Sequence, residues 1–223
     1  MATPLPPDAL VPVKPSLRGV SHQIAFFVAI GLGVALVLTA PGGRATATAA
    51  VYAAGVCGLF GISALYHRRT WATERARAWM RRLDHSMIFV FIAATYTPVA
   101  VLAMHGTLGT VIFVVVWSGA LAGVSISLIW PHAPKWLSAL VYISLGWVAV
   151  AAMPQLWDEI GPWSVLGLAL GGVLYTAGAV VYARGRPDPR PAVFGYHEIF
   201  HACVVVAAGV HYAVIAFAVL PRG

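Results

Sequence analysis

The chain has 223 residues, of which 60% are hydrophobic and only 9% are charged, and its mean hydropathy is +0.84. Soluble domains carry about 25% charged residues, so the composition excludes an ordinary soluble protein and predicts an integral membrane protein. The formal net charge is +7. No basic face with interleaved aromatic residues lies outside the apolar runs, and this argues against nucleic acid as a partner.

The chain begins with a proline-rich stretch, which we expect to form a disordered cytoplasmic arm over residues 1–18. Seven apolar runs follow, each close to the ~20 residues that cross a bilayer as a helix. They predict an all-α, seven-helix transmembrane domain over residues 19–223. The expected spans are 20–40, 46–67, 83–104, 109–130, 135–153, 163–183 and 197–220.

Basic residues are distributed unequally between the two sides that these spans define. Twelve of the 14 lie on the side of the N-terminus, and only Arg44 and Arg222 lie on the other. The positive-inside rule therefore places the N-terminus in the cytoplasm and the C-terminus outside. Arginine outnumbers lysine by 12 to 2. This bias is typical of GC-rich bacteria, so we expect a multi-pass protein of the bacterial inner (plasma) membrane.

The connection between the second and third spans is rich in arginine and also contains Trp71 and Trp79. A basic and aromatic segment of this kind is typical of the headgroup region, so residues 68–82 are expected to bind anionic lipid. The alternative is a short basic loop in solvent. Membrane lipids are the expected surroundings in either case, and no feature of the sequence indicates an oligomeric state.

Ionisable residues occur at the ends of three predicted spans. His197 and His201 are four residues apart, so they share one face of the last helix, while His67 ends the second span and Asp84 begins the third. With the predicted topology, all four lie in the cytoplasmic leaflet. Ionisable groups inside a membrane are costly, and they indicate a functional site.

Three histidines with one exchangeable water form the usual coordination of catalytic zinc. Zinc lowers the pKa of such a water towards ~7. Asp84 can then accept a proton from the water or hold it in place. Ser63 lies four residues before His67, and its hydroxyl can stabilise an oxyanion or bind a water molecule. The alternative is a buried polar network without a metal ion.

The string His197-Glu198-Ile199-Phe200-His201 also matches the HExxH motif of metalloproteases, in which the glutamate is a general base. However, no acidic residue follows it that could complete such a site. Glu198 lies off the histidine face, and we expect it to pair with a cytoplasmic arginine such as Arg82. His22 and His211 are interpreted as interhelical hydrogen-bond partners. His85 points about 100° away from Asp84 on a helix and is left out of the ligand set.

Three motifs in this order resemble a known family. Ser63-Ala-Leu-Tyr-His67, Arg82-Leu-Asp84 and His197-Glu-Ile-Phe-His201 are similar to the signature of the hemolysin III branch of the progestin and adipoQ receptor family. The wider group includes the alkaline ceramidases. The resemblance implies a zinc ion bound by His67, His197 and His201. It further implies that Asp84 engages the zinc-bound water molecule and that Ser63 lies beside Asp84. It also implies hydrolysis of a lipid substrate such as a ceramide or another acyl amide or ester.

Two other functions stay open. The first is a membrane-homeostasis or sensor protein in which the zinc is structural. The second is a pore-forming cytolysin, as the family name suggests, although the sequence has no secretion signal and no polar stripe typical of a channel.

Overall fold

The computed structural model describes residues 14–130 and 133–223, which form helices without a β-strand. Seven helical segments of this part are long and apolar enough to cross a membrane, and they confirm the predicted all-α, seven-span fold. In chain order they are α1 (Val20–Thr39), α2 (Gly43–Arg68), α3 (Glu74–Leu102), α4 (Gly106–Ile129), α5 (Lys135–Gly146) with η1 (Trp147–Ala152) and α6 (Met153–Ile160), α7 (Pro162–Arg184), and α8 (Tyr196–Val214) with η2 (Ile215–Val219) and η3 (Leu220–Arg222).

Two spans are longer than the sequence predicts. Helix α3 begins at Glu74 because the Thr73 hydroxyl accepts a hydrogen bond from the backbone N–H of Ala76 at 3.1 Å and caps the helix. The fifth span runs on to Ile160 through a break after Gly146. At this break the Tyr96 hydroxyl donates to the Gly146 carbonyl (2.6 Å) and accepts from the Ala149 N–H (2.8 Å). One side chain thus satisfies backbone groups that the interrupted helix leaves free.

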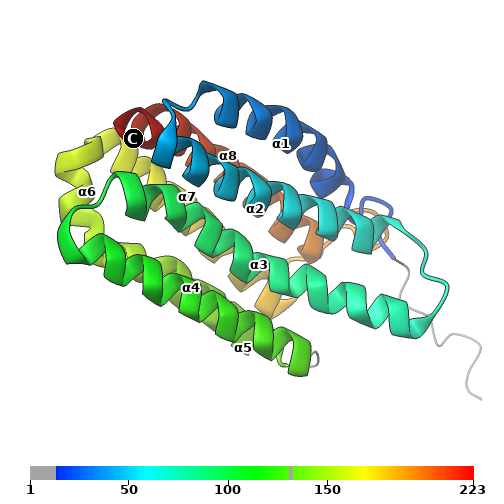
Figure 1. The fold of residues 1–223 in the computed structure, drawn as a ribbon. Coiled ribbons are helices and arrows are strands. Elements are labelled where there is room, and N and C mark those ends of the chain that lie inside the picture. Colours follow the sequence, from blue (N-terminus) through cyan, green and yellow to red (C-terminus); the bar gives the residue numbers. More distant parts are fainter. Residues whose placement is uncertain (1–13, 131–132) are drawn as a thin grey trace, which may run out of the picture.

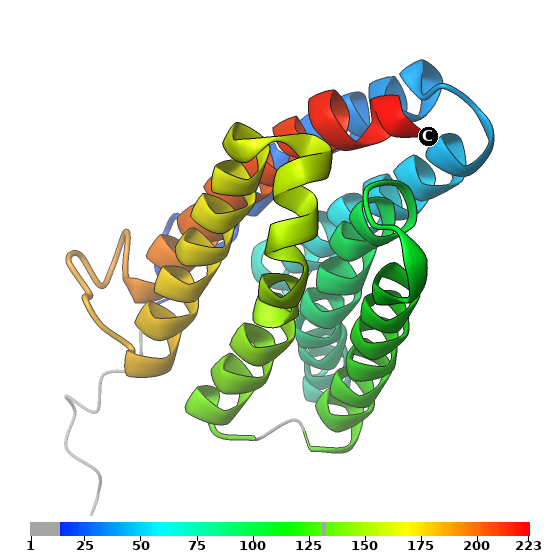
Figure 2. The same ribbon diagram turned by 90° about the vertical axis from the view of Figure 1, so that its left-hand side faces the viewer.

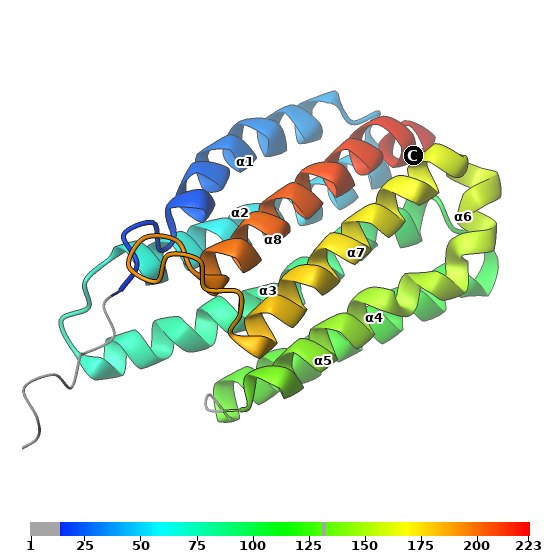
Figure 3. The same ribbon diagram turned by 180° about the vertical axis from the view of Figure 1, so that it is seen from behind.

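The helices form a closed arrangement, shown in Figures 1 and 3. Helices α1 to α4 pack in chain order, each against the next, and α5 packs mainly against α7. Helix α7 packs along α8, and α8 returns to α1. The space between α2 and α3 on one side and α5, α7 and α8 on the other is therefore surrounded by helices.

The outer surface of the bundle is apolar. The side chains of Phe27, Leu38 and Phe217 are 65%, 78% and 80% exposed, which suits contact with lipid and not with water. Inside, small residues allow helices to approach closely. A Cβ atom added to Gly55 would lie 2.4 Å from the Cβ of Ala94, so α2 and α3 could not pack as they do with a larger residue there.

The two ends of the bundle are distinct. One end, which we call the site end, contains the ends of α2 and α4 and the starts of α5 and α8 (Figure 3). The opposite end contains the C-terminus beside the start of α2 (Figure 2), so Arg44 and Arg222 lie there together. This agrees with the predicted division of basic residues. Which end faces the cytoplasm stays a prediction from the charges.

The predicted arm over residues 1–18 lies outside the described residues up to position 13. The part that is described, Lys14 to Arg18, packs against the loop between α7 and α8 (Figure 3). Backbone N–H groups of Ser16 and Leu17 donate to the carbonyls of Ala192 and Val193, at 3.0 and 3.2 Å. This segment therefore belongs to the folded site end.

Candidate metal centre

Three histidines from two helices meet at the site end. His67 lies in the last turn of α2, and His197 and His201 lie in the first two turns of α8. One ring nitrogen of each can be chosen so that all three atoms lie within 4.8 Å of one another. The i, i+4 spacing places the α8 pair on one face, and the end of α2 brings His67 against it.

The geometry fits one metal ion. His67 Nε2 and His197 Nε2 are 3.2 Å apart. Two nitrogens bound to one tetrahedral zinc ion at ~2.05 Å would be separated by about 3.3 Å. Imidazole rings bind a metal ion through a ring nitrogen, and the His201 Nδ1 atom is buried without a hydrogen-bond partner among the described residues. A direct hydrogen bond between the His67 and His197 rings, without a metal ion, would give the same 3.2 Å separation. Such a metal-free network would leave His201 without a partner, whereas a metal ion would bind all three rings.

Asp84 and Ser63 lie beside the three histidines. Asp84 Oδ2 is 3.8 Å from His67 Nε2, and the Asp84 side chain is 13% exposed. Ser63 is buried one turn before His67 on α2, and its hydroxyl lies next to the Asp84 carboxylate. The structure therefore brings together all five residues proposed from the sequence, and their roles as ligands, base and hydrogen-bond donor remain predictions.

His22 is a residue of this site that the sequence reasoning missed. Its ring stacks on that of His201, with centroids 3.7 Å apart and planes inclined by 4°. It was predicted to be an interhelical hydrogen-bond partner, but within residues 14–130 and 133–223 neither of its ring nitrogens has one. One signal was available, because the predicted topology places His22 near the same membrane surface as His67 and His201.

Glu198 does not point at the histidines. Its carboxylate pairs with the guanidinium of Arg18 and accepts a hydrogen bond from the Gly195 N–H at 2.8 Å. Glu198 thus pairs with an arginine of the predicted cytoplasmic side, as expected, but the partner is Arg18 and not Arg82, because the segment before α1 crosses the site end. These two contacts make Glu198 a cap of the first turn of α8. Its carboxylate points away from the three histidines and is therefore not positioned to act as a general base there.

The segment before α1 also packs against His67. Lys14 donates a hydrogen bond to the His67 carbonyl oxygen. Burial, and then the nearby guanidinium groups of Arg68 and Arg18, lower the pKa of the Lys14 ammonium group below its usual value. Gly19 has a φ of +80°, and a Cβ added to it would lie 2.6 Å from the Cβ of His67. Only glycine allows the chain to turn into α1 this close to the histidine.

The other two histidines near the cavity have separate contacts. His85 Nδ1 lies 2.8 Å from the Arg81 carbonyl oxygen, and its Nε2 lies 3.4 Å from the Tyr182 hydroxyl, so it stands outside the three-histidine group as predicted. His211 Nε2 is 3.1 Å from the carbonyl oxygen of Leu168 on α7, which matches the predicted interhelical hydrogen bond.

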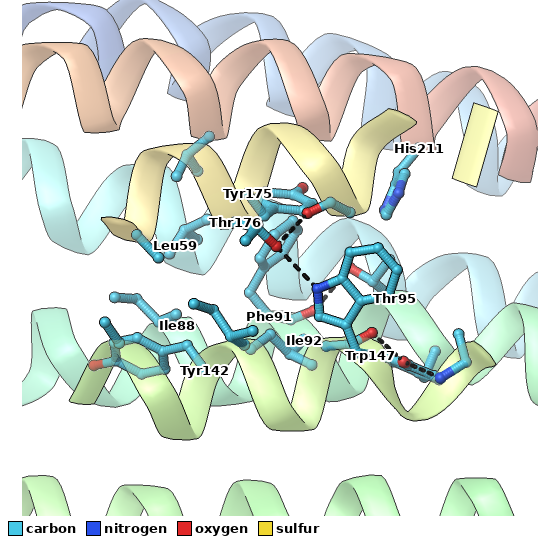
Figure 4. A pocket seen from close by; sticks show the side chains of 18 of the residues that line it. Leu59, Ile88, Phe91, Ile92, Thr95, Tyr142, Trp147, Tyr175, Thr176 and His211 are labelled. Atoms are coloured by element: carbon cyan, nitrogen blue, oxygen red, sulfur yellow. Dashed lines mark hydrogen bonds between the residues drawn. The ribbon is translucent and has the colours of Figure 1, made fainter. Parts of the chain in front are cut away.

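A long cavity extends from the histidines through the bundle. Ser63, Asp84 and His201 line it at the site end, and Val99, Met153 and Leu156 line it near the opposite end. Asp84 and Val99 are separated along α3 by about 22 Å, at 1.5 Å per residue. Most of the cavity wall is apolar, and the polar side chains of Thr95, Tyr175, Thr176 and His211 are interspersed along it. Figure 4 shows its middle part, where the indole N–H of Trp147 donates to the Thr176 hydroxyl at 2.9 Å.

These features define a class: a seven-helix membrane protein with three histidines able to hold a metal ion at one end of an apolar internal cavity. A protein-family model described as Haemolysin-III related matches residues 11–212. The chain therefore belongs to the haemolysin III-related family, as the motifs predicted.

Relatives occur in bacteria and in animals. The chain is 32% identical to the Hemolysin-3 homolog of Bacillus subtilis over 147 residues, which is 66% of this chain and 65% of that protein. It is 27% identical to Hemolysin-3 of Bacillus cereus over 207 residues, 92% of this chain and 91% of that protein. It is also 28% identical to the human Monocyte to macrophage differentiation factor over 171 residues, 75% of this chain and 68% of that protein.

Proposed function

We propose that this chain is a zinc-dependent hydrolase of lipid amides or esters, acting from the leaflet at the site end. The observation that carries the proposal is the position of the three histidines, Asp84 and Ser63 at one end of a long apolar cavity. The donor set of three neutral imidazoles favours zinc over the hard cations that oxygen ligands select.

The residues around the centre have distinct roles in this proposal. His67, His197 and His201 would hold the ion. When bound, zinc supplies a Lewis acid that lowers the pKa of a water molecule to ~7. Asp84, whose carboxylate lies 3.8 Å from the His67 ring, would act as the proton acceptor and donor of the site: it would take a proton from an attacking water molecule and return one to the leaving amine or alcohol. Ser63, whose hydroxyl lies next to the Asp84 carboxylate, would donate its one hydrogen to the substrate carbonyl oxygen once Asp84 has taken up a proton and no longer needs it.

The cavity selects the substrate. Its mostly apolar wall suits a fatty acyl chain, and its extent of about 22 Å along α3 exceeds the ~15 Å half-thickness of a bilayer core that one acyl chain spans. The scissile carbonyl group would then lie at the site end beside Asp84. The acyl half of a ceramide or of another acyl amide has this shape, with a polar amide group at one end of a long hydrocarbon chain.

The test is hydrolysis by purified protein in detergent or in lipid nanodiscs. Ceramides, acyl amides and acyl esters of different chain lengths are supplied, and released fatty acid is measured by mass spectrometry. We expect release from at least one class, its loss after chelation and its recovery after zinc is added. Zinc-loaded protein that releases no fatty acid from any of these substrates would contradict the proposal.

A membrane-homeostasis or sensor function with a structural metal is the second candidate. It is favoured by the origin of the histidines in α2 and α8, helices far apart in the chain that one ion would cross-link. This candidate predicts that chelation lowers the thermal unfolding temperature of the protein strongly while no lipid is hydrolysed. An unfolding temperature that does not change on chelation would exclude it.

Cytolysis is the third candidate, and it follows from the name of the Bacillus cereus relative, Hemolysin-3. The mostly apolar wall of the cavity does not favour it, because an ion path needs polar groups or water along its length. Conductance in planar bilayers that persists after all three histidines are replaced by alanine would support a lytic function independent of the metal.

A further inference from the structure

A second polar feature of the site end is a pocket of about 320 Å³ that lies between α3, α4, α5 and α7. His85 and Tyr182 line both this pocket and the long cavity, so they form the wall between the two. Its charged residues are Arg81, Arg82 and Lys135, and we call it the basic pocket. None of its described lining residues is acidic.

The three cations have no acidic partner among the described residues, where none of them forms an ion pair. Arg82 Nε is buried and has no hydrogen-bond acceptor there. Buried donors are almost always satisfied, so an unsatisfied one indicates a missing acceptor.

Lys135 is held at the rim of the pocket but keeps free donors. Its ammonium group donates to the Tyr196 hydroxyl at 2.8 Å and lies 4.8 Å from the centre of the Tyr196 ring. An ammonium group has three hydrogens, so two remain for a ligand. The positive charge of Lys135 is therefore positioned at the edge of the pocket, and no acidic side chain among the described residues neutralises it.

The surroundings of the pocket match the depth of lipid headgroups. Trp130 lines the pocket and is half-exposed, and Trp79, which stacks on the Arg82 guanidinium at 4.9 Å, is exposed as well. Tryptophan side chains at the end of a helical bundle are typical of the membrane interface. The pocket also has an apolar side formed by Phe89, Ile126 and Val141.

We propose that the basic pocket binds a phosphate group, carried either by an anionic phospholipid or by a soluble phosphate ester. Two guanidinium groups present fork-shaped donors that match phosphate oxygens, and the lysine adds a third charge. The site is separate from the histidine centre, and the proposal does not depend on hydrolysis. It also narrows the expected anionic-lipid contact of residues 68–82 to Arg81 and Arg82, with a third cation from α5.

The experiment measures ligand binding to purified protein in detergent by native mass spectrometry. The probes are phosphatidylglycerol, phosphatidylcholine, glycerol phosphate and inorganic phosphate. The pocket variant combines Arg82→Gln with Lys135→Gln. The control variant combines Arg75→Gln with Arg77→Gln, which removes the same charge from exposed positions of the same basic segment of α3.

We expect the pocket variant to bind phosphatidylglycerol at least about tenfold more weakly than wild type, and the control variant to change by less than about twofold. Competition by glycerol phosphate at similar concentrations would assign the site to soluble phosphate esters, and its failure to compete would assign it to the lipid. Equal losses in both variants, or unchanged binding in the pocket variant, would overturn the proposal. If the double variant does not fold, Lys135→Gln alone is used, because Lys135 is exposed at the rim and its replacement leaves the helices intact.

Discussion

The two ends of the helical bundle are built from different chemistry. The site end contains three histidines, a mostly buried aspartate and most of the basic residues. At the opposite end the charged residues are exposed or paired at the surface: Arg44 donates to the Val101 carbonyl at 2.8 Å, His105 pairs with Glu159 at 3.2 Å, and Asp158 and Arg222 are exposed. Both ends close the bundle, but the buried histidines and the buried carboxylate of the described residues (His22, His67, Glu198 and His201) all lie at the site end.

This difference indicates where function lies. A buried ionisable group costs free energy, whereas an exposed pair at a helix end costs almost nothing and adds little. A fold that needed only to close its helices could do so as the opposite end does. We therefore interpret the polar groups of the site end as serving binding or chemistry, and we expect changes there to have effects that matched changes at the opposite end or on exposed surfaces do not.

The largest effect is expected for Asp84→Asn. The amide keeps the size of the side chain but cannot accept a proton, so fatty acid release should fall by about 10²–10⁴-fold with metal content unchanged. Fatty acid release and zinc content are measured on the same sample. Asp158→Asn at the opposite end is the control and should leave the rate unchanged. Full activity in Asp84→Asn would show that this carboxylate takes no part in the chemistry.

Glu198→Gln should destabilise the protein. It leaves the Arg18 guanidinium without a counter-charge at a largely buried position, at a cost of roughly 3 kcal/mol. Thermal unfolding in detergent measures the loss. Glu74→Gln removes an exposed partner of Arg77 and should change stability by less than about 0.5 kcal/mol. Loss of hydrolysis at unchanged stability would instead restore Glu198 as a general base.

Gly19→Ala tests how closely the turn before α1 is fitted to the centre. The new Cβ would clash with His67 at a backbone φ of +80°, so we expect a loss of about 1–3 kcal/mol and weaker metal binding. Unfolding temperature and a zinc titration measure both effects. Gly31→Ala in α1 has no atom within 4 Å of the new Cβ and should be neutral or slightly stabilising. Equal behaviour of the two variants would contradict the close fit.

Gly172→Leu should have the smallest effect of these variants, and the effect should be a change in the preferred acyl-chain length of the substrate. Gly172 lines the middle of the cavity, and a leucine there would shorten the space for an acyl chain. We expect the preference for long over short acyl chains to fall by about tenfold, with zinc content unchanged. Gly209→Leu faces outward on α8 and serves as the control. An unchanged chain-length profile would mean that the acyl chain binds elsewhere.

Much of the fold could be predicted from the sequence, because crossing a bilayer constrains it strongly. Each span needs a long apolar run, and consecutive spans must alternate in direction, so His67, Asp84 and His201 could be assigned to one end without any tertiary information. The extension of α3 to Glu74 and the break after Gly146 were not predicted. The first depends on a local cap at Thr73, and the second on a hydroxyl from a distant helix, Tyr96.

The rotation of each helix about its own axis, which decides the side chains that face the interior, was harder to predict than the positions of the spans. Helix α1 buries His22, Ala25 and Ala29 on one face, but the residues on its other faces are just as apolar, so no contrast marks the buried face. The stacking of His22 on His201 therefore could not be read from the pattern. The partner of Glu198 could not be read either, since it depends on the path of the segment before α1, which places Arg18 at the site end.

The central claim is that His67, His197 and His201 hold one metal ion, and elemental analysis tests it most directly. Purified wild type is compared with His197→Ala and with His105→Ala, which changes an exposed histidine of the opposite end. We predict about one equivalent of zinc in wild type and in His105→Ala, and none in His197→Ala. Wild-type protein without bound metal after purification in zinc, or His197→Ala that keeps a full equivalent, would contradict the claim.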